Sequence, residues 1–147
     1  MERTIKLLKG LILGFLFIFS ATSCSKTALN TVLLEGKWKT REIAVQEYEN
    51  NKLVEAGTFQ CIEFYMIFDL NADGTGELKT YDEGDISRTP IDWQVKGNKF
   101  MLFDTETRYF DIVSLDSGSM ALKYTNEEID EDERYKQILT FYFDKMD

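Results

Sequence analysis

The sequence predicts an all-β domain of about eight antiparallel strands that follows an N-terminal secretion signal. From residue 36 onward, apolar and polar residues alternate with the period of two that strands require. Turn residues separate these segments at even spacing, which is the signature of an up-and-down barrel or of a sandwich. No alternation of strand and helix patterns and no internal repeat interrupts the series.

The first segment of the chain directs export and lies outside the fold. Arg3, Lys6 and Lys9 precede an unbroken apolar run over residues 10–19. A basic head followed by an apolar stretch of roughly 7–15 residues is typical of a secretory signal. The run is shorter than the about 20 apolar residues of a membrane-spanning helix, and it lacks the polar face of a helix on a soluble domain. We therefore predict a signal peptide over residues 1–23.

The end of this signal, residues 20–24, resembles a bacterial lipobox, in which small residues precede a cysteine that receives diacylglycerol before cleavage. Ser23 is the small residue before Cys24, and Ala21 stands where leucine is usual. The resemblance implies that a lipid on Cys24 anchors the protein in a membrane. Ser25, with no acidic cluster behind it, implies a Gram-negative outer-membrane lipoprotein facing the periplasm. The alternative is ordinary cleavage after Ala21 or Ser23, which leaves a soluble secreted protein.

Residues 24–32 are expected to form the lipidated N-terminus and a short polar tether, and residues 33–147 the barrel domain. The near-helical spacing of Leu29, Val32 and Leu33 allows one helical turn before the first strand. From there the period changes to two, and the first strand is expected from residue 36.

The segment over residues 46–58 has two readings. Asn50 and Asn51 favour a turn between two strands. The alternative is a short helix over residues 48–56 that ends at Gly57. We favour the turn.

The clearest strand pattern covers residues 60–70. Five apolar residues at alternate positions share one face: Ile62, Phe64, Met66, Phe68 and Leu70. Strict alternation over this length predicts one continuous, half-buried antiparallel strand. Asp73 and Gly74 then supply the positive φ that a tight hairpin needs, so a return strand is expected over residues 75–81.

Hairpins continue to the C-terminus. Further strands are expected around residues 91–95, 99–102, 108–115, 120–124 and 135–143. Gly97 and Asn98 form a two-residue hairpin signal. The acidic stretch over residues 126–133 is expected to be a solvated loop, and docking of a cationic partner there is the less favoured reading.

Composition excludes several classes of function. The chain contains no histidine, which removes Ser-His-Asp and Cys-His catalysis and every imidazole metal site. If Cys24 carries lipid, Cys61 has no partner for a disulfide and is expected to be an unreactive thiol. The formal net charge is −9, and removing residues 1–23, which hold three basic residues and one acidic residue, leaves −11. A chain this acidic repels phosphate backbones. We therefore predict no nucleic-acid partner.

Residues 69–74 match the first half of a calcium loop, with the pattern D-x-N-x-D-G. A complete loop needs a bidentate acid at its twelfth position, and that position is Thr80. Asp73 and Gly74 are also what a hairpin requires. We therefore predict no metal site here.

Several short motifs in order along the chain resemble the lipocalins. Gly36 and Trp38 form a Gly-x-Trp at the first strand, where lipocalins place the tryptophan of the barrel floor. The hairpin at residues 73–75, the segment 93–98 and the late strand 139–143 complete the likeness to the small lipocalin-like domains of bacterial lipoproteins. The resemblance implies an antiparallel up-and-down β-barrel with an apolar interior that takes small lipophilic ligands.

Two features depart from the larger lipocalins. Their Thr-Asp-Tyr signature is absent. Their late arginine, which stacks on the floor tryptophan, has no clear equivalent, and Lys145 or Arg134 would be its substitute.

The leading hypothesis for function is therefore a lipid-anchored, non-catalytic binding module without a cofactor. Its candidate ligand-binding residues fall in apolar phase on their strands: Trp38, Phe64, Met66, Trp93 and Tyr124. The alternative is an envelope interaction or assembly protein with an unknown protein partner and a barrel filled by its own side chains. Large inward candidates favour such filling: Phe64, Met66, Phe68, Phe100, Leu102, Phe141 and Phe143. An enzyme that uses carboxylate pairs is the third and least favoured reading.

Overall fold

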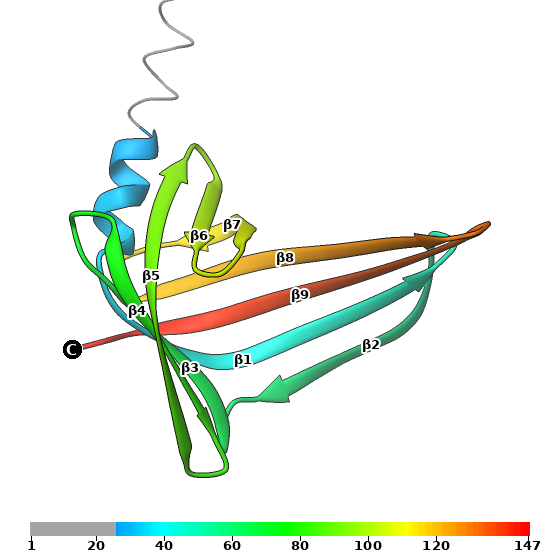
Figure 1. Cartoon of the computed structure of the whole chain (residues 1–147), viewed down its shortest axis with the longest axis horizontal. Helices are drawn as coiled ribbons and strands as arrows, with labels where there is room; N and C mark the ends of the chain where they lie inside the picture. The colour runs from blue at the N-terminus through cyan, green and yellow to red at the C-terminus, as the bar shows by residue number, and fades with distance from the viewer. Residues whose placement is uncertain (1–25) are drawn as a thin grey trace, which may run out of the picture.

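The computed structural model describes residues 26–147 as one short helix followed by nine antiparallel strands (Figure 1). The helix covers residues 26–34. The strands are β1 (Gly36–Glu49), β2 (Lys52–Gln60), β3 (Phe64–Leu70), β4 (Thr75–Asp82), β5 (Asp85–Lys96), β6 (Lys99–Phe103), β7 (Thr107–Leu115), β8 (Ser119–Asp130) and β9 (Glu133–Met146). Within this part of the chain, no helix is both long and apolar enough to cross a bilayer.

Eight of the strands close into an up-and-down barrel, as the sequence predicts. Each strand from β3 to β9 pairs with its neighbour in sequence, and β1 closes the ring by pairing with both β3 and β9. The ninth strand, β2, lies outside the ring and pairs only with the second half of β1. The all-β barrel is thus confirmed, with one strand more than its closure needs.

Four long strands continue past the barrel as a sheet in the order β2-β1-β9-β8, which we call the distal sheet (residues 42–60 and 124–140). In Figure 1 it extends away from the helix and from strands β6 and β7. At its tip, Asn50 and Asn51 have φ values of 50° and 65° and form a tight turn between β1 and β2. The predicted turn is therefore confirmed, and the alternative helix is wrong.

The acidic stretch over residues 126–133 is mostly strand, so the predicted loop is wrong. Strands β8 and β9 stay paired out to Asp130 and Glu133, and only two residues form the turn. Cross-strand attraction offsets the acidic composition, because Glu127 faces Lys136 in the ladder and accepts an ion pair from Arg134 Nε at 3.2 Å. Such exposed pairs are worth at most about 1 kcal/mol each, but they remove like-charge repulsion along the ladder.

The strand predicted over residues 60–70 is broken. β2 ends at Gln60, residues 61–63 bend, and β3 begins at Phe64. Ile62, expected on the inner face, is 79% exposed. The break lies where β1 changes its partner from β3 to β2, between Lys39 and Glu42. The register of β1 against β9 also shifts there, between Thr40 and Glu42, and such an irregularity bends a strand.

Thr40 replaces the ladder bonds that this break removes. Its hydroxyl accepts a bond of 2.7 Å from Met66 N and lies 3.3 Å from Met66 O, to which it can donate. Cys61 N donates to Arg41 O at 2.8 Å. The backbone is thus satisfied across the bend, and strands β2 and β3 can diverge there to open the barrel.

The opposite end of the barrel is closed by the helix. Trp38 is fully buried and donates from Nε1 to Leu34 O, the last helical residue, at 2.8 Å. Asn30 Nδ2 donates to Gly97 O at 2.9 Å, and Gly97 N donates to Thr27 Oγ1 at 2.8 Å. Residues 26–32, assigned from sequence to a tether, are therefore helical and fixed to the β5–β6 hairpin. Helix and strands share one core, so residues 26–147 form a self-contained folding unit.

Candidate ligand-binding site

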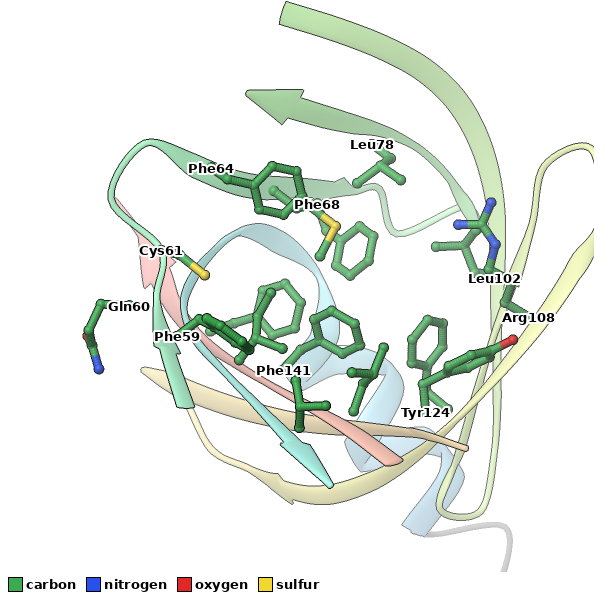
Figure 2. Close-up of a pocket in the computed structure, with 16 residues that line it drawn as sticks. Phe59, Gln60, Cys61, Phe64, Phe68, Leu78, Leu102, Arg108, Tyr124 and Phe141 are labelled. Atoms are coloured by element: carbon green, nitrogen blue, oxygen red, sulfur yellow. The ribbon is translucent and has the colours of Figure 1, made fainter. Parts of the chain in front are cut away.

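A cavity of about 690 Å³ lies between the barrel interior and the inner face of the distal sheet (Figure 2). Its walls are almost entirely apolar. β3 and β4 supply Phe64, Met66, Phe68 and Leu78; the distal sheet supplies Ile43, Val45, Phe59 and Leu139; the barrel interior supplies Leu102, Phe110, Phe141 and Phe143. The cavity is open to solvent, because two residues of its wall, Phe59 and Phe64, remain 60% and 42% exposed.

The barrel is filled in one half and open in the other. Phe100, Leu102 and Phe143 are at most 1% exposed and pack with Trp38 in a continuous core at the closed end. Toward the bend at residues 61–63, β3 carries Phe64 and Met66 into the cavity. Both interior arrangements considered from the sequence thus occur, at opposite ends of one barrel.

Four polar side chains line the cavity. Gln60 and Cys61 lie at one end, and Arg108 and Tyr124 lie at the other (Figure 2). Burial raises the pKa of the Cys61 thiol and outweighs the bond from Thr40 that lowers it. A raised pKa keeps the thiol protonated near neutral pH, which favours an unreactive cysteine.

Arg108, in the cavity wall, forms ion pairs with two carboxylates. Its Nη2 contacts Asp104 Oδ2 at 2.9 Å, and its Nε contacts Glu106 Oε1 at 3.2 Å. The hydrogen bond from Glu106 N, together with the charge of Arg108, holds the pKa of Asp104 below its usual range despite burial. Asp104 is therefore ionised at neutral pH, and it fixes the guanidinium at this end of the cavity.

The structure brings three of the five predicted ligand-binding residues into the cavity: Phe64, Met66 and Tyr124. The two tryptophans lie elsewhere. Trp38 closes the floor, and Trp93, 5% exposed, donates from Nε1 to Asn71 O and Thr75 O at 3.1 and 3.0 Å. Their ring nitrogens are satisfied by backbone carbonyls, so both act as core residues. Cys24 lies outside the described residues.

Sequence reasoning missed the wall formed by the distal sheet. Ile43 and Val45 stand at alternate positions and so carried a signal. The two readings of residues 46–58 left open the strand that aligns Phe59 with Ile43. Arg108 carried no signal, because a single charge after a turn resembles any solvated residue.

In the calcium-like stretch over residues 69–74, the Asp73 carboxylate forms hydrogen bonds within the turn. The Asp73 carboxylate accepts bonds from Thr75 N at 3.0 Å and from Thr75 Oγ1 at 2.6 Å. These bonds, the side-chain bond first, lower the pKa of Asp73. Gly74, with φ of 87°, completes the hairpin.

We expect no calcium binding at this turn in the range of about 10⁻⁷–10⁻⁵ M that is typical of sensor loops. The reason is that the Asp73 carboxylate already caps the turn and that Thr80 cannot supply the closing acid. Titration calorimetry on residues 26–147 tests this. A one-to-one isotherm that disappears in Asp73→Ala would show that the stretch is a metal site.

Residues 34–122 match the family model described as the lipocalin-like domain, which is more than half of the chain. The chain belongs to the lipocalin-like domain family. Proteins of the lipocalin fold typically bind small hydrophobic ligands and are generally non-catalytic. No curated protein matches this chain.

Solved structures share the lipocalin fold at low sequence identity. Lobster apocrustacyanin A1 aligns with a TM-score of 0.50 at 14% identity, over 86% of this chain and 68% of the other. Apocrustacyanin C1 gives a TM-score of 0.50 at 10% identity, with coverage of 86% and 68%. A bovine odorant-binding protein in complex with a selenium-containing odorant gives 0.47 at 17% identity, with coverage of 80% and 75%. At these identities the likeness concerns the fold alone.

A lysine occupies the place of the late arginine of larger lipocalins. Lys145 Nζ lies 4.9 Å from the centroid of the Trp38 ring and 3.4 Å from Leu33 O. It therefore combines a cation–π contact with a hydrogen bond to the end of the helix. Arg134, the other candidate from the sequence, lies at the tip of the distal sheet and pairs with Glu127.

Proposed function

We propose that this protein is a non-catalytic binding protein that holds one small apolar ligand in the cavity between the barrel and the distal sheet. The observation that carries the proposal is the cavity itself, an open volume of about 690 Å³ with apolar walls and four polar side chains. Small-molecule sites in proteins span about 300–1,000 Å³ and combine apolar walls with a few polar groups. Proteins of the lipocalin fold typically bind small hydrophobic ligands, which supports the same assignment.

We further propose that the protein is a lipoprotein of the Gram-negative outer membrane and faces the periplasm. The support is the signal over residues 1–23, the lipobox resemblance that ends at Cys24, and Ser25 behind it. The membrane partner is reached through the lipid on Cys24.

A second candidate is an envelope interaction protein that acts through the distal sheet. The observation that favours it is β2, whose nine residues are all exposed and whose outer edge has no partner strand within residues 26–147. Unpaired edges of this length can add a strand from another chain. We rank this candidate second because the apolar cavity accounts for more of the buried aromatic residues.

The ligand proposal is tested by removing one aromatic from the cavity and one from the core. We expect wild-type residues 26–147 to bind the neutral probe N-phenyl-1-naphthylamine saturably. Phe64→Ala should weaken this binding with a small loss of stability, because Phe64 is 42% exposed. Phe100→Ala, at 0% exposure, should instead cost about 3–5 kcal/mol of unfolding free energy. Fluorescence titration and urea unfolding measure the two effects.

Tyr124→Ala serves as a second cavity variant, since Tyr124 is half-buried at the other end of the site. Large destabilisation at both Phe64 and Tyr124, with no saturable binding by wild type, would exclude the ligand-binding role. It would leave the interaction protein.

A further inference from the structure

The charge at the Arg108 end of the cavity indicates which ligands the site accepts. This inference rests on the proposed ligand-binding function. Arg108 is the one charged side chain among the described residues that line the cavity, and Figure 2 shows it beside Leu102 at the end where Tyr124 also lies. A cation in an apolar pocket would by itself attract a carboxylate.

Arg108 is, however, already neutralised. The Asp104 side chain is only 5% exposed and contacts the guanidinium at 2.9 Å, whereas Glu106 contacts it from a 70% exposed position. Buried Asp104 and half-buried Arg108 thus form a neutral pair next to the cavity, and Glu106 adds a solvent-screened negative charge. A bound carboxylate would bring a negative charge without a counterion into an apolar site, which is costly.

Arg108 nevertheless keeps hydrogen-bonding capacity. A guanidinium has five N–H groups, and the contacts to Asp104 and Glu106 use Nη2 and Nε. Within residues 26–147, no hydrogen bond or ion pair of Arg108 uses Nη1, and Tyr124 lies at the same end of the cavity. These groups match an uncharged acceptor such as an ester, ketone or alcohol oxygen. The net charge of −9 over the chain also disfavours the approach of anions.

We propose that the cavity selects neutral amphiphiles, with an apolar body on the aromatic walls and an uncharged hydrogen-bond acceptor at Arg108, and discriminates against the corresponding carboxylates. The apolar body lies between Arg108 and the end marked by Gln60 and Cys61. Affinity comes from the apolar walls, and the Arg108–Asp104 pair sets the preference for the head group.

The test compares two ligands that differ in the head group alone. Methyl dodecanoate and dodecanoate displace N-phenyl-1-naphthylamine from residues 26–147 at pH 8, the ester below its solubility limit and dodecanoate below its critical micelle concentration. We expect the ester to bind about tenfold more tightly or better, a difference that corresponds to about 1.4 kcal/mol. Equal or tighter binding of dodecanoate by wild type would overturn the proposal.

Asp104→Asn tests the electrostatic cause. The substitution removes the charge but keeps an Oδ1 acceptor for the bond of 3.0 Å from Glu106 N. Arg108 then lacks its buried counterion, and the ester-to-carboxylate preference should narrow or reverse. Glu106→Gln makes the same charge change at an exposed position and should alter the preference less. An unchanged preference in a folded Asp104→Asn protein would overturn the proposal.

Arg108→Met tests the donor. Methionine keeps an unbranched apolar stem but removes every side-chain N–H, so we expect affinity for methyl dodecanoate to fall several-fold. Affinity for the ester equal to that of wild type would overturn the role of Arg108. Failure of the probe itself to bind wild type would refute the proposed function, whereas probe binding without head-group preference refutes only this inference.

Discussion

Trp38→Ala is expected to lower the unfolding free energy of residues 26–147 by about 3–5 kcal/mol, the range for deleting a buried aromatic ring. Trp38 is 0% exposed, donates to Leu34 O and stacks under Lys145 Nζ. Its removal leaves a cavity at the closed end of the barrel and an unpaired carbonyl at the end of the helix. The loss should therefore exceed that of Phe64→Ala at the exposed part of the cavity wall. Urea unfolding followed by circular dichroism measures it.

Tyr109→Ala provides the control for this measurement. Tyr109 is an aromatic residue of the same barrel but is 58% exposed, so its truncation should change stability by no more than about 0.5 kcal/mol. A Trp38→Ala protein as stable as Tyr109→Ala would show that the helix and the floor tryptophan contribute nothing to the fold. Trp38→Phe keeps most of the volume and isolates the hydrogen bond to Leu34 O.

Cys24→Ser should release the protein from the membrane completely. Serine keeps the size of the side chain but lacks the thiol that the lipid modification requires, so no anchor forms. Fractionation of cells should move the variant from the membrane to the soluble fraction, and mass spectrometry of wild type should show the added lipid.

Cys61→Ser is the matched control for anchoring. It removes the other cysteine of the chain, which lies at the cavity and outside the signal region. This variant should remain membrane-bound. A Cys24→Ser protein that stays with the membrane, together with an unmodified mass for wild type, would exclude the lipoprotein assignment and favour the soluble alternative.

Turn chemistry makes most of the fold readable from the sequence. Asn50, Asn51 and Gly74 adopt positive φ, and they belong to the residue types that tolerate this region, so their positions in the sequence locate the turns. Alternation between the turns then indicates strands and a buried face. Local signals of this kind act within a few residues, which is why they can be read without tertiary information.

Where the fold differs from prediction, the cause is not local. The break at residues 61–63 coincides with the irregularity of β1 at residues 40–42, a partner segment about 20 residues away in the sequence. Unbroken alternation could not reveal it. The acidic stretch over residues 126–133 forms strand, with Glu127 opposite Lys136 and in an ion pair with Arg134 across the hairpin. Composition alone favours a loop.

Only part of the candidate site could be predicted from the sequence, because local patterns do not show how far along the barrel a residue lies. Apolar phase identifies Phe64, Met66 and Tyr124, which line the cavity, but it cannot separate them from Trp38 and Trp93 in the core. The alternation of apolar residues shows which face of a strand a side chain occupies, but it does not show the side chain's position along the barrel axis. Depth depends on where the helix closes one end and where the strands diverge at the other.

The position of the helix also sets how an anchored molecule would face the bilayer. Residue 26, the first that the structure describes, lies in the helix at the closed end, and two residue steps from Cys24 to residue 26 can span at most about 7 Å. Under the proposed lipidation, the barrel floor would rest close to the lipid headgroups. The 14 residues of β1 then lead away from it, over about 46 Å at the usual rise of a strand, past the cavity wall at Ile43 and Val45. The opening would face the aqueous phase, so cargo would be exchanged with a soluble donor or acceptor and would not enter laterally from the leaflet that holds the anchor.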